Sequence, residues 1–167
     1  MSKRWGNVIN PDDVIEKFGA DAMRVYEMFM GPFTQNIAWS TNGVTGTYRF
    51  LEKVWKLGSK VSEDRTTDNK LRNLIHKTIK KVAGDIENFR FNTAVSSLMI
   101  LANTFEKEEG INAKDFQCFL LLLSPFAPHI SEELWSSFAK ASADKSADKE
   151  KYEKSIFLQS WPEYDPE

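Results

Sequence analysis

Residues 68–89, DNKLRNLIHKTIKKVAGDIENF, carry apolar side chains at the spacing of one helix face. At about 100° per residue these side chains fall within an arc of ~60°; they are Leu71, Leu74, Ile75, Thr78, Val82, Ile86 and Phe89. The spacing predicts one long amphipathic helix from about Asp68 to Phe89. Its apolar face has to be covered by neighbouring elements, and both flanks of the stretch offer further helices.

The segment before this stretch predicts a second amphipathic helix. Thr41 or Asn42 is placed to cap it, and it runs to about Leu57. Its apolar side is expected to consist of Val44, Tyr48, Leu51 and Trp55. Residues 58–67 are polar and read as a loop.

Three more helices are expected after the stretch. Asn92 is predicted to cap a helix whose apolar positions are Val95, Leu98, Met99, Ala102 and Phe105. Residues 116–123 are apolar nearly all round, which indicates a buried central helix ended by Pro125 and Pro128. Ser131 opens another short helix.

The two ends of the chain are less regular. Asn10 to Asp13 form a helix start for residues up to Phe18, and residues 20–30 form a second short helix. Residues 140–154 are rich in Lys, Asp and Glu and are expected to form a solvated loop. Residues 156–161 look extended. The predicted fold is therefore all-α, a helical bundle with short irregular or extended ends.

Composition limits the function. The chain has 167 residues, 41% of them hydrophobic and 28% charged, with a net charge of −2. Its single cysteine and two histidines exclude a disulfide framework and a cysteine- or histidine-rich metal site. The longest unbroken apolar run is Cys118 to Leu123, which is too short to span a membrane. We therefore expect a cytoplasmic protein without a membrane or metal partner.

No self-sufficient catalytic site is visible in the sequence. It lacks a glycine-rich phosphate loop, a His-Glu-x-x-His pair and a Gly-x-Ser-x-Gly turn. His76 and His129 are expected to have structural or surface roles, and Cys118, inside an apolar helix, is expected to be a core residue. We accordingly predict no catalytic residue in this chain alone.

Two lines of cations are candidates for a nucleic-acid surface. The first basic stripe consists of Arg49, Lys53 and Lys56, opposite the predicted apolar side of the helix over 42–57. The second basic stripe, within 68–89, consists of Lys70, Lys77 and Lys81. Residues 68–90 hold six Lys or Arg against three Asp or Glu. Such lines suit contacts to phosphates, although cations opposite an apolar face are also what any solvated surface helix carries.

A lone aromatic residue in the predicted connection between helices adds a further candidate. Trp39 lies within residues 33–41, near the first basic stripe. It could stack on a base or a ribose, and it could equally pack within its own loop.

Several ordered motifs resemble one family. Met1-Ser2-Lys3-Arg4 is similar to the Lys-Met-Ser-Lys-Ser loop of class I aminoacyl-tRNA synthetases, and residues 6–24 look like the segment that follows that loop. Residues 39–57 and 76–94 resemble leucyl-tRNA synthetases of the bacterial type, as does the closing Trp161-Pro162-Glu163. Residues 124–135, SPFAPHISEELW, are similar to the leucyl, isoleucyl and valyl branches. The loop's first lysine is absent and Arg4 stands where the family has its last serine.

The resemblance implies a role within a larger enzyme. Residues 1–32 would be the end of the catalytic-core loop with stem-contact helices, and residues 33–167 the anticodon-binding helical bundle. The full-length enzyme would attach leucine to tRNA(Leu) using ATP and magnesium, with Lys3 on the ATP phosphates and Ser2 as its neighbour. Its catalytic, editing and C-terminal domains would lie outside this stretch, so we expect this chain to be inactive alone.

In the leucyl branch the resemblance implies contacts mainly to the tRNA backbone. Two other interpretations stay open at this point. One is a helical protein-interaction module without a nucleic-acid role, and the other is the same domain of an isoleucyl- or valyl-tRNA synthetase.

Overall fold

The computed structural model describes residues 8–141 and 155–165, with side chains for residues 8–137 and 155–165. Seven α-helices lie within this part of the chain, so the all-α prediction is confirmed. They are α1 (Pro11–Phe18), α2 (Ala20–Phe29), α3 (Thr41–Leu57), α4 (Asn69–Glu87), α5 (Phe91–Lys107), α6 (Ala113–Leu123) and α7 (Pro128–Ala141).

Short elements join these helices. The 3₁₀ turn η2 (Gly58–Lys60) leads into the strand β1 (Val61–Ser62), which pairs in parallel with β2 (Ile111–Asn112). The pairing ties the loop after α3 to the start of α6. A second 3₁₀ turn, η3 (Ile156–Leu158), begins the segment predicted to be extended, so the prediction is wrong for these three residues. Gln159, directly after them, has an extended backbone. Ser155 explains the difference, because its hydroxyl accepts the Phe157 N–H at 3.3 Å and caps the turn.

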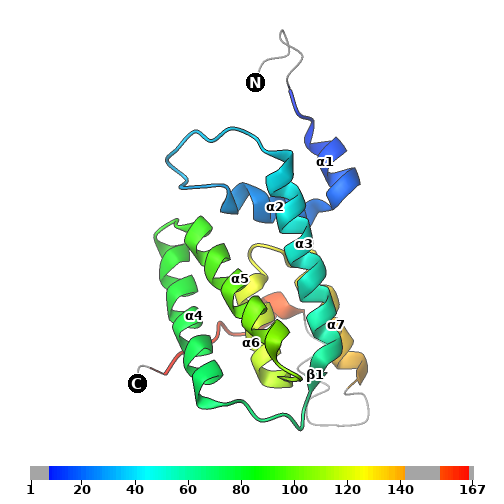
Figure 1. Cartoon of the computed structure of the whole chain (residues 1–167), viewed down its shortest axis with the longest axis vertical. Coiled ribbons are helices and arrows are strands. Elements are labelled where there is room, and N and C mark those ends of the chain that lie inside the picture. Colours follow the sequence, from blue (N-terminus) through cyan, green and yellow to red (C-terminus); the bar gives the residue numbers. More distant parts are fainter. Residues whose placement is uncertain (1–7, 142–154, 166–167) are drawn as a thin grey trace.

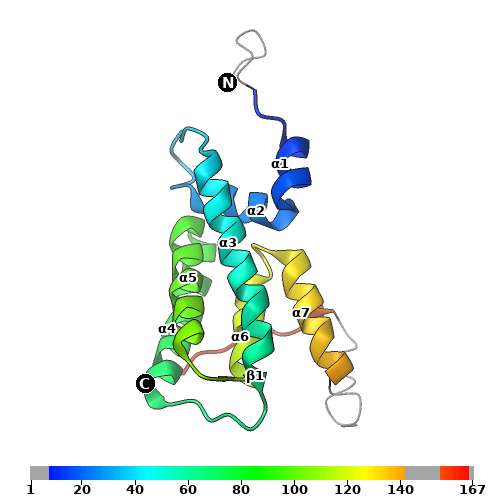
Figure 2. The same ribbon diagram turned by 45° about the vertical axis from the view of Figure 1, so that its right-hand side comes forward.

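The helices form an elongated bundle. α3 runs from the end that carries α1 and α2 to the end that carries β1, and α4 and α5 form a hairpin beside it (Figure 1). α6 and α7 complete the bundle next to the lower half of α3 (Figure 2). No described helix is both long enough and apolar enough to span a bilayer.

The buried face of α3 differs from the predicted one. Val44 and Leu51 are buried as expected, but Tyr48 and Trp55 are 39% and 53% exposed, so their assignment to the core is wrong. The helix is turned toward α2 and α5, and its buried residues also include Thr47, Phe50, Val54 and Leu57. Thr47 can be buried because its hydroxyl donates to a backbone carbonyl: the Ala22 and Val44 oxygens both lie 2.9 Å away.

α4 follows its prediction until its last turn. Leu71, Ile75, Thr78 and Val82 are buried, together with the unpredicted Ile79 and Asp85. Phe89 does not continue the apolar face, because the helix ends at Glu87 and the Phe89 backbone turns to a φ of 55°.

The start of α5 is organised by Asp85 rather than by Asn92. The helix begins at Phe91, so the predicted Asn92 cap is wrong. The buried Asp85 carboxylate accepts hydrogen bonds from Thr93 Oγ1 at 2.6 Å and from Arg90 Nε at 2.9 Å. It also accepts one from Lys81 Nζ at 2.8 Å. One carboxylate therefore fixes the turn between α4 and α5.

The start of α7 is held by α2. α7 begins at Pro128, three residues before the predicted Ser131. Asp21 of α2 accepts the Ile130 N–H at 2.8 Å, and its other oxygen lies 2.7 Å from His129 Nδ1. Arg24 Nη2 donates to the Pro125 carbonyl at 3.2 Å. These contacts fasten α2 to the α6–α7 connection.

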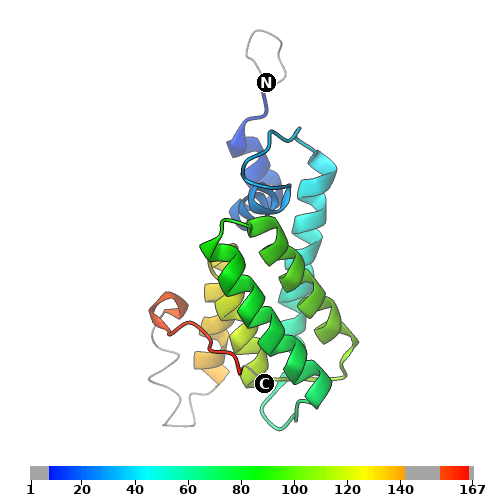
Figure 3. The ribbon, with the colours of Figure 1, turned by 90° about the vertical axis from the view of Figure 1, so that its left-hand side faces the viewer.

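The last described segment crosses from α7 toward α4 (Figure 3). Glu132 accepts the Ile156 N–H at 3.0 Å, and Ile156 is buried. The Asp165 N–H donates to His76 Nδ1 at 3.0 Å, so His76 has the structural role predicted for it. α7 includes residues 140 and 141, and the rest of the predicted loop 140–154 lies outside the described residues.

Candidate nucleic-acid interface

The two basic stripes lie on helices that flank α5. Figure 3 shows α4, α5 and α3 side by side on one face of the bundle. The first basic stripe lies along α3, where Arg49 and Lys56 are exposed and have no ion pair with a described residue. Lys53 is engaged, because its Nζ lies 2.7 Å from both Glu106 Oε2 and Asn103 Oδ1 of α5.

Glu106 therefore adds a negative charge to the first basic stripe. The hydrogen bond from Lys53 lowers the pKa of the Glu106 carboxyl, and the nearby charges of Lys53, Lys60 and Lys56 act in the same direction. Glu106 accordingly stays ionised and paired in neutral solution. Of the three predicted cations, two are left free toward solvent.

The second basic stripe is also divided. Lys81 Nζ forms an ion pair with Asp85 Oδ2, at 2.8 Å, in the last part of α4. Burial opposes ionisation of Asp85, but hydrogen bonds from Lys81, Thr93 and Arg90 outweigh it, so the pKa of this carboxyl is lowered. Lys70 and Lys77 have no ion pair with a described residue.

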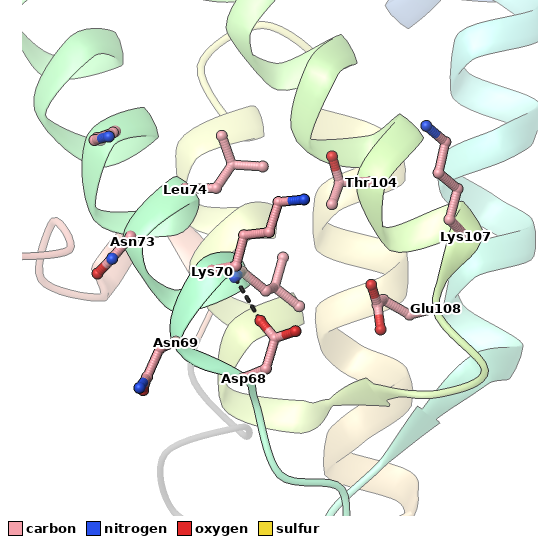
Figure 4. Close-up of a pocket in the computed structure, with 10 residues that line it drawn as sticks. Asp68, Asn69, Lys70, Asn73, Leu74, Thr104, Lys107 and Glu108 are labelled. Carbon is pink, nitrogen blue, oxygen red and sulfur yellow. Dashed lines mark hydrogen bonds between the residues drawn. The ribbon is translucent and has the colours of Figure 1, made fainter.

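Lys70 and Lys77 line a cleft between α4 and α5. The cleft has a volume of about 760 Å³. Figure 4 shows side chains from both helices around it, with Lys70 of α4 and Lys107 of α5 among them. Its lining residues are Asp68, Asn69, Lys70, Leu71, Asn73, Leu74, Lys77, Thr104, Lys107 and Glu108. We call it the α4–α5 cleft.

The α4–α5 cleft gathers three lysines against two carboxylates. One carboxylate, Asp68, is occupied as the N-cap of α4, since its Oδ1 accepts the Leu71 N–H at 2.7 Å. The other is Glu108, which follows α5 directly. Amines beside Leu74 and Thr104, which also line the cleft, suit a phosphate and the sugar attached to it.

Lys107 is a site residue that sequence reasoning missed. It lies 30 residues beyond Lys77 and belongs to neither stripe. The hairpin of α4 and α5 brings the last turn of α5 to the first turn of α4, which places Lys107 across the cleft from Lys70. A short connection after a long predicted helix could have signalled such a hairpin.

Trp39 lies away from the cleft, just before α3 at the end of the bundle that carries α1 and α2. Its ring meets Tyr26 edge-on at 4.9 Å, and its Nε1 donates to Thr41 Oγ1 at 3.3 Å. It is half-buried, and its stacking on RNA stays a prediction.

The other chemical candidates are Ser2, Lys3, Cys118 and any metal-binding side chains. Ser2 and Lys3 lie outside the described residues. Cys118 is half-buried and packs against the core, and burial raises the pKa of its thiol to about 12. Among the described residues, no group of three His, Cys, Asp or Glu side chains could hold a metal ion.

Known protein families match two parts of the chain. Residues 68–167 match the family described as the anticodon-binding domain of tRNA ligase. Residues 1–40 match the family described as class I tRNA synthetases (I, L, M and V). Both α4 and α5, and with them the cleft, fall in the first match.

Individual relatives agree with these families. The leucine–tRNA ligase of Borrelia hermsii is 46% identical over 167 residues, and that of Alkaliphilus oremlandii is 44% identical over 165. Each alignment covers 99% of this chain but only 18% or 19% of the relative, so the chain spans about a fifth of the curated relatives' length.

A solved structure shares the fold. It is the ternary complex of Agrobacterium radiobacter K84 agnB2 LeuRS with tRNA and LeuAMS, which is 28% identical and superposes with a TM-score of 0.78. The match covers 99% of this chain and 22% of that one. Taken with the family match over 68–167 and the helical bundle itself, these likenesses establish that the chain belongs to the anticodon-binding domain family of tRNA ligases.

Proposed function

We propose that this chain is the tRNA-binding helical domain of a cytoplasmic leucine–tRNA ligase and that it holds tRNA(Leu) on the face formed by α3, α5 and α4. The observation that carries the proposal is the α4–α5 cleft. Lys70, Lys77 and Lys107 converge on it from two helices, and none has an ion pair with a described residue.

The contrast with four other cations of the chain supports this choice. Lys53, Arg65, Lys81 and Arg90 each form an ion pair with a carboxylate of the chain. The cleft lysines leave their charge available, and neutralising a phosphate releases a condensed counterion from the nucleic acid. Contacts of this kind recognise the shape and charge of an RNA backbone without reading bases.

The activity of the whole enzyme is part of the proposal. It would activate leucine with ATP and magnesium and transfer it to tRNA(Leu), as the names of the relatives suggest. We assign Lys3 to the ATP phosphates, with Ser2 beside it, because both match the family's loop. Residues 1–32 would then be the end of the catalytic-core loop with the stem-contact helices, and residues 33–167 the anticodon-binding helical bundle.

Binding of a tRNA(Leu) transcript tests the proposal. The affinity of the chain is measured at several salt concentrations, for the wild type and for the triple variant Lys70→Gln/Lys77→Gln/Lys107→Gln. If each lysine contacts one phosphate, the slope of log K against log salt should fall by about 0.7–0.9 per lysine removed. A second triple variant, Arg49→Gln/Lys53→Gln/Lys56→Gln, tests the first basic stripe. Because Lys53 already pairs with Glu106, this second variant should lower the slope by less than the cleft variant does.

Lys17→Gln/Lys114→Gln is the matched control, since both lysines are exposed on other helices and lie outside the cleft. It should leave the slope near that of the wild type. Binding that is absent at low salt, or insensitive to salt, would refute the proposal and favour a protein-interaction module instead.

A further inference from the structure

Two phenylalanines are exposed at the end of the α4–α5 hairpin farthest from the cleft. Phe89 is 66% exposed in the turn between the helices, and Phe33 is 71% exposed in the loop that follows α2. Both rings meet Phe91 edge-on, with centroid distances of 5.8 Å for Phe89 and 5.7 Å for Phe33. We call Phe33, Phe89 and Phe91 the aromatic patch.

The backbone at Phe89 is unfavourable for the residue that occupies it. Its φ of 55° lies in the left-handed region, which glycine normally fills at the end of a helix. Two backbone hydrogen bonds hold the turn, Phe89 N–H to the Ile86 carbonyl at 3.1 Å and Arg90 N–H to the Asp85 carbonyl at 2.7 Å. Neither burial nor backbone preference therefore accounts for an aromatic side chain here.

The patch is joined to the core although its outer rings face solvent. Phe91 is half-buried and contacts Phe126 edge-on at 6.3 Å, and Phe126 is a core residue. The neighbouring Arg90 donates from its Nε to the buried Asp85 at 2.9 Å. Both exposed rings therefore contact a ring that packs on the core.

The patch also lies at the end of the second basic stripe. Lys70, Lys77 and Lys81 share one side of α4 within about 40° of arc. Lys81 is paired with Asp85, so Lys70 and Lys77 are the stripe's cations without an ion pair to a described residue. A phosphate backbone that contacts Lys70 and Lys77 in the α4–α5 cleft and continues along α4 in the same direction reaches the turn that carries Phe89. At that point the chain offers aromatic faces, on which a nucleobase can stack whatever its sequence.

We propose that Phe89 and Phe33 stack on an unpaired nucleobase of the bound tRNA. The proposal rests on the proposed function, and it adds a base contact to a surface otherwise expected to touch only the backbone. Phe33 also borders a hollow of about 310 Å³, whose lining residues include Gln35 and Asn36. Amides can pair with the edges of a base, so this loop supplies partners beside the stack.

A nucleobase fits the patch better than an apolar protein surface does. A stable protein interface buries about 800 Å² on each partner, with an apolar centre. Here charged residues adjoin Phe89 in the chain: Glu87 ends α4 and Arg90 precedes α5. Two exposed rings that both contact Phe91, with charged residues beside them, suit a flat aromatic ligand attached to a phosphate.

The test uses the tRNA(Leu) transcript and replaces the rings with leucine. Phe33→Leu/Phe89→Leu keeps apolar side chains but removes the aromatic faces. It should weaken binding about tenfold and leave the salt slope unchanged, since no phosphate contact is lost. Phe157→Leu is the matched control: Phe157 is 55% exposed, but it lies in η3, outside the patch, and its replacement should not alter binding.

Two further variants separate binding from folding. Phe89→Gly removes the ring and suits the left-handed backbone, so it should weaken binding without lowering the melting temperature. Phe89→Trp keeps an aromatic face, so it should preserve affinity, and its added indole emission should be quenched when tRNA binds.

The outcomes distinguish failure of the stacking proposal from failure of the proposed function. Unchanged affinity in Phe33→Leu/Phe89→Leu, with weakened binding in the cleft triple variant, overturns the stacking proposal and leaves the proposed function standing. A wild-type chain that does not bind the transcript overturns both. A lowered salt slope, or a change in oligomeric state, in the leucine variant overturns stacking as well, because the patch would then act through charge or through a second copy.

Discussion

Lys53 Nζ of α3 lies 2.7 Å from Glu106 Oε2 of α5, and this ion pair places a carboxylate within the first basic stripe. Arg49 and Lys56, on either side of Lys53, are exposed and have no such partner among the described residues. The surface that α3 offers to an anion is therefore interrupted by the chain's own negative charge.

Glu106→Gln should strengthen tRNA binding. The change removes the negative charge that pairs with Lys53 and repels phosphate, so affinity should rise about two- to fivefold at low salt and the gain should vanish at high salt. Parallel titrations with Glu109→Gln, whose carboxylate pairs with Arg65 instead, supply the control. Equal affinity of wild type and Glu106→Gln at low salt would show that α3 does not face the RNA.

Asp85→Asn should destabilise the bundle by about 1–3 kcal/mol, because a buried carboxylate with three donors is replaced by an amide. The folded-state pKa of Asp85 is lowered, so its contribution is present above the unfolded pKa of about 3.9 and is lost as pH falls through the folded value. Urea unfolding of both proteins should give a constant difference between about pH 5 and 7 that shrinks below about pH 4.

Asp64→Asn, at an exposed position, is the reference for this series. A stability difference for Asp85→Asn that persisted undiminished to pH 2 would contradict the assignment of the effect to the ionised carboxylate.

Gly43→Ala should destabilise the start of α3. A Cβ at this position would lie 2.5 Å from Tyr26 Cε2. The Tyr26 ring is held by its hydroxyl, which accepts the Ser40 N–H at 2.7 Å. Overpacking of this kind costs about 1–3 kcal/mol, which thermal or urea unfolding can measure. Gly46→Ala in the same helix meets no atom within 4 Å and should be neutral or stabilising by up to ~1 kcal/mol. Equal effects of the two changes would disprove the steric argument.

Lys3→Ala in the full-length enzyme should slow leucine-dependent ATP–pyrophosphate exchange at least tenfold, or ~1.4 kcal/mol. The reason is that an ammonium group at this loop position would stabilise charge on the departing pyrophosphate. Lys17→Ala, in the exposed surface of α1, provides the comparison. An exchange rate equal to that of the wild type would remove Lys3 from the ATP site.

Helical periodicity predicted most of the helices to within a few residues, because amphipathic spacing and capping residues are local signals. It failed where a contact with a distant segment decided the outcome. Tyr48 and Trp55 satisfy the spacing of α3 but not the direction in which α2 and α5 cover it. Asn92 has the chemistry of a cap, yet Asp85 from the preceding helix fixes that turn.

The residues of the candidate site were likewise predictable only in part. Lys70 and Lys77 could be found from the sequence, because they lie opposite the apolar face of a single helix. Lys107 joins them only through the hairpin, and Phe33 meets Phe91 across 58 residues of chain. Which lysines are neutralised by Glu106 and Asp85 likewise depends on three-dimensional contacts that no linear pattern encodes.

Asp21 joins α2 to the beginning of α7. Its carboxylate belongs to the region matched by the class I synthetase family, while the Ile130 N–H and His129 that it holds belong to the region matched by the anticodon-binding family. Because Asp21 holds both groups, a displacement of α2 would also displace the beginning of α7. The position of α2, next to α1, is thereby coupled to the α6–α7 connection on the other side of the family boundary.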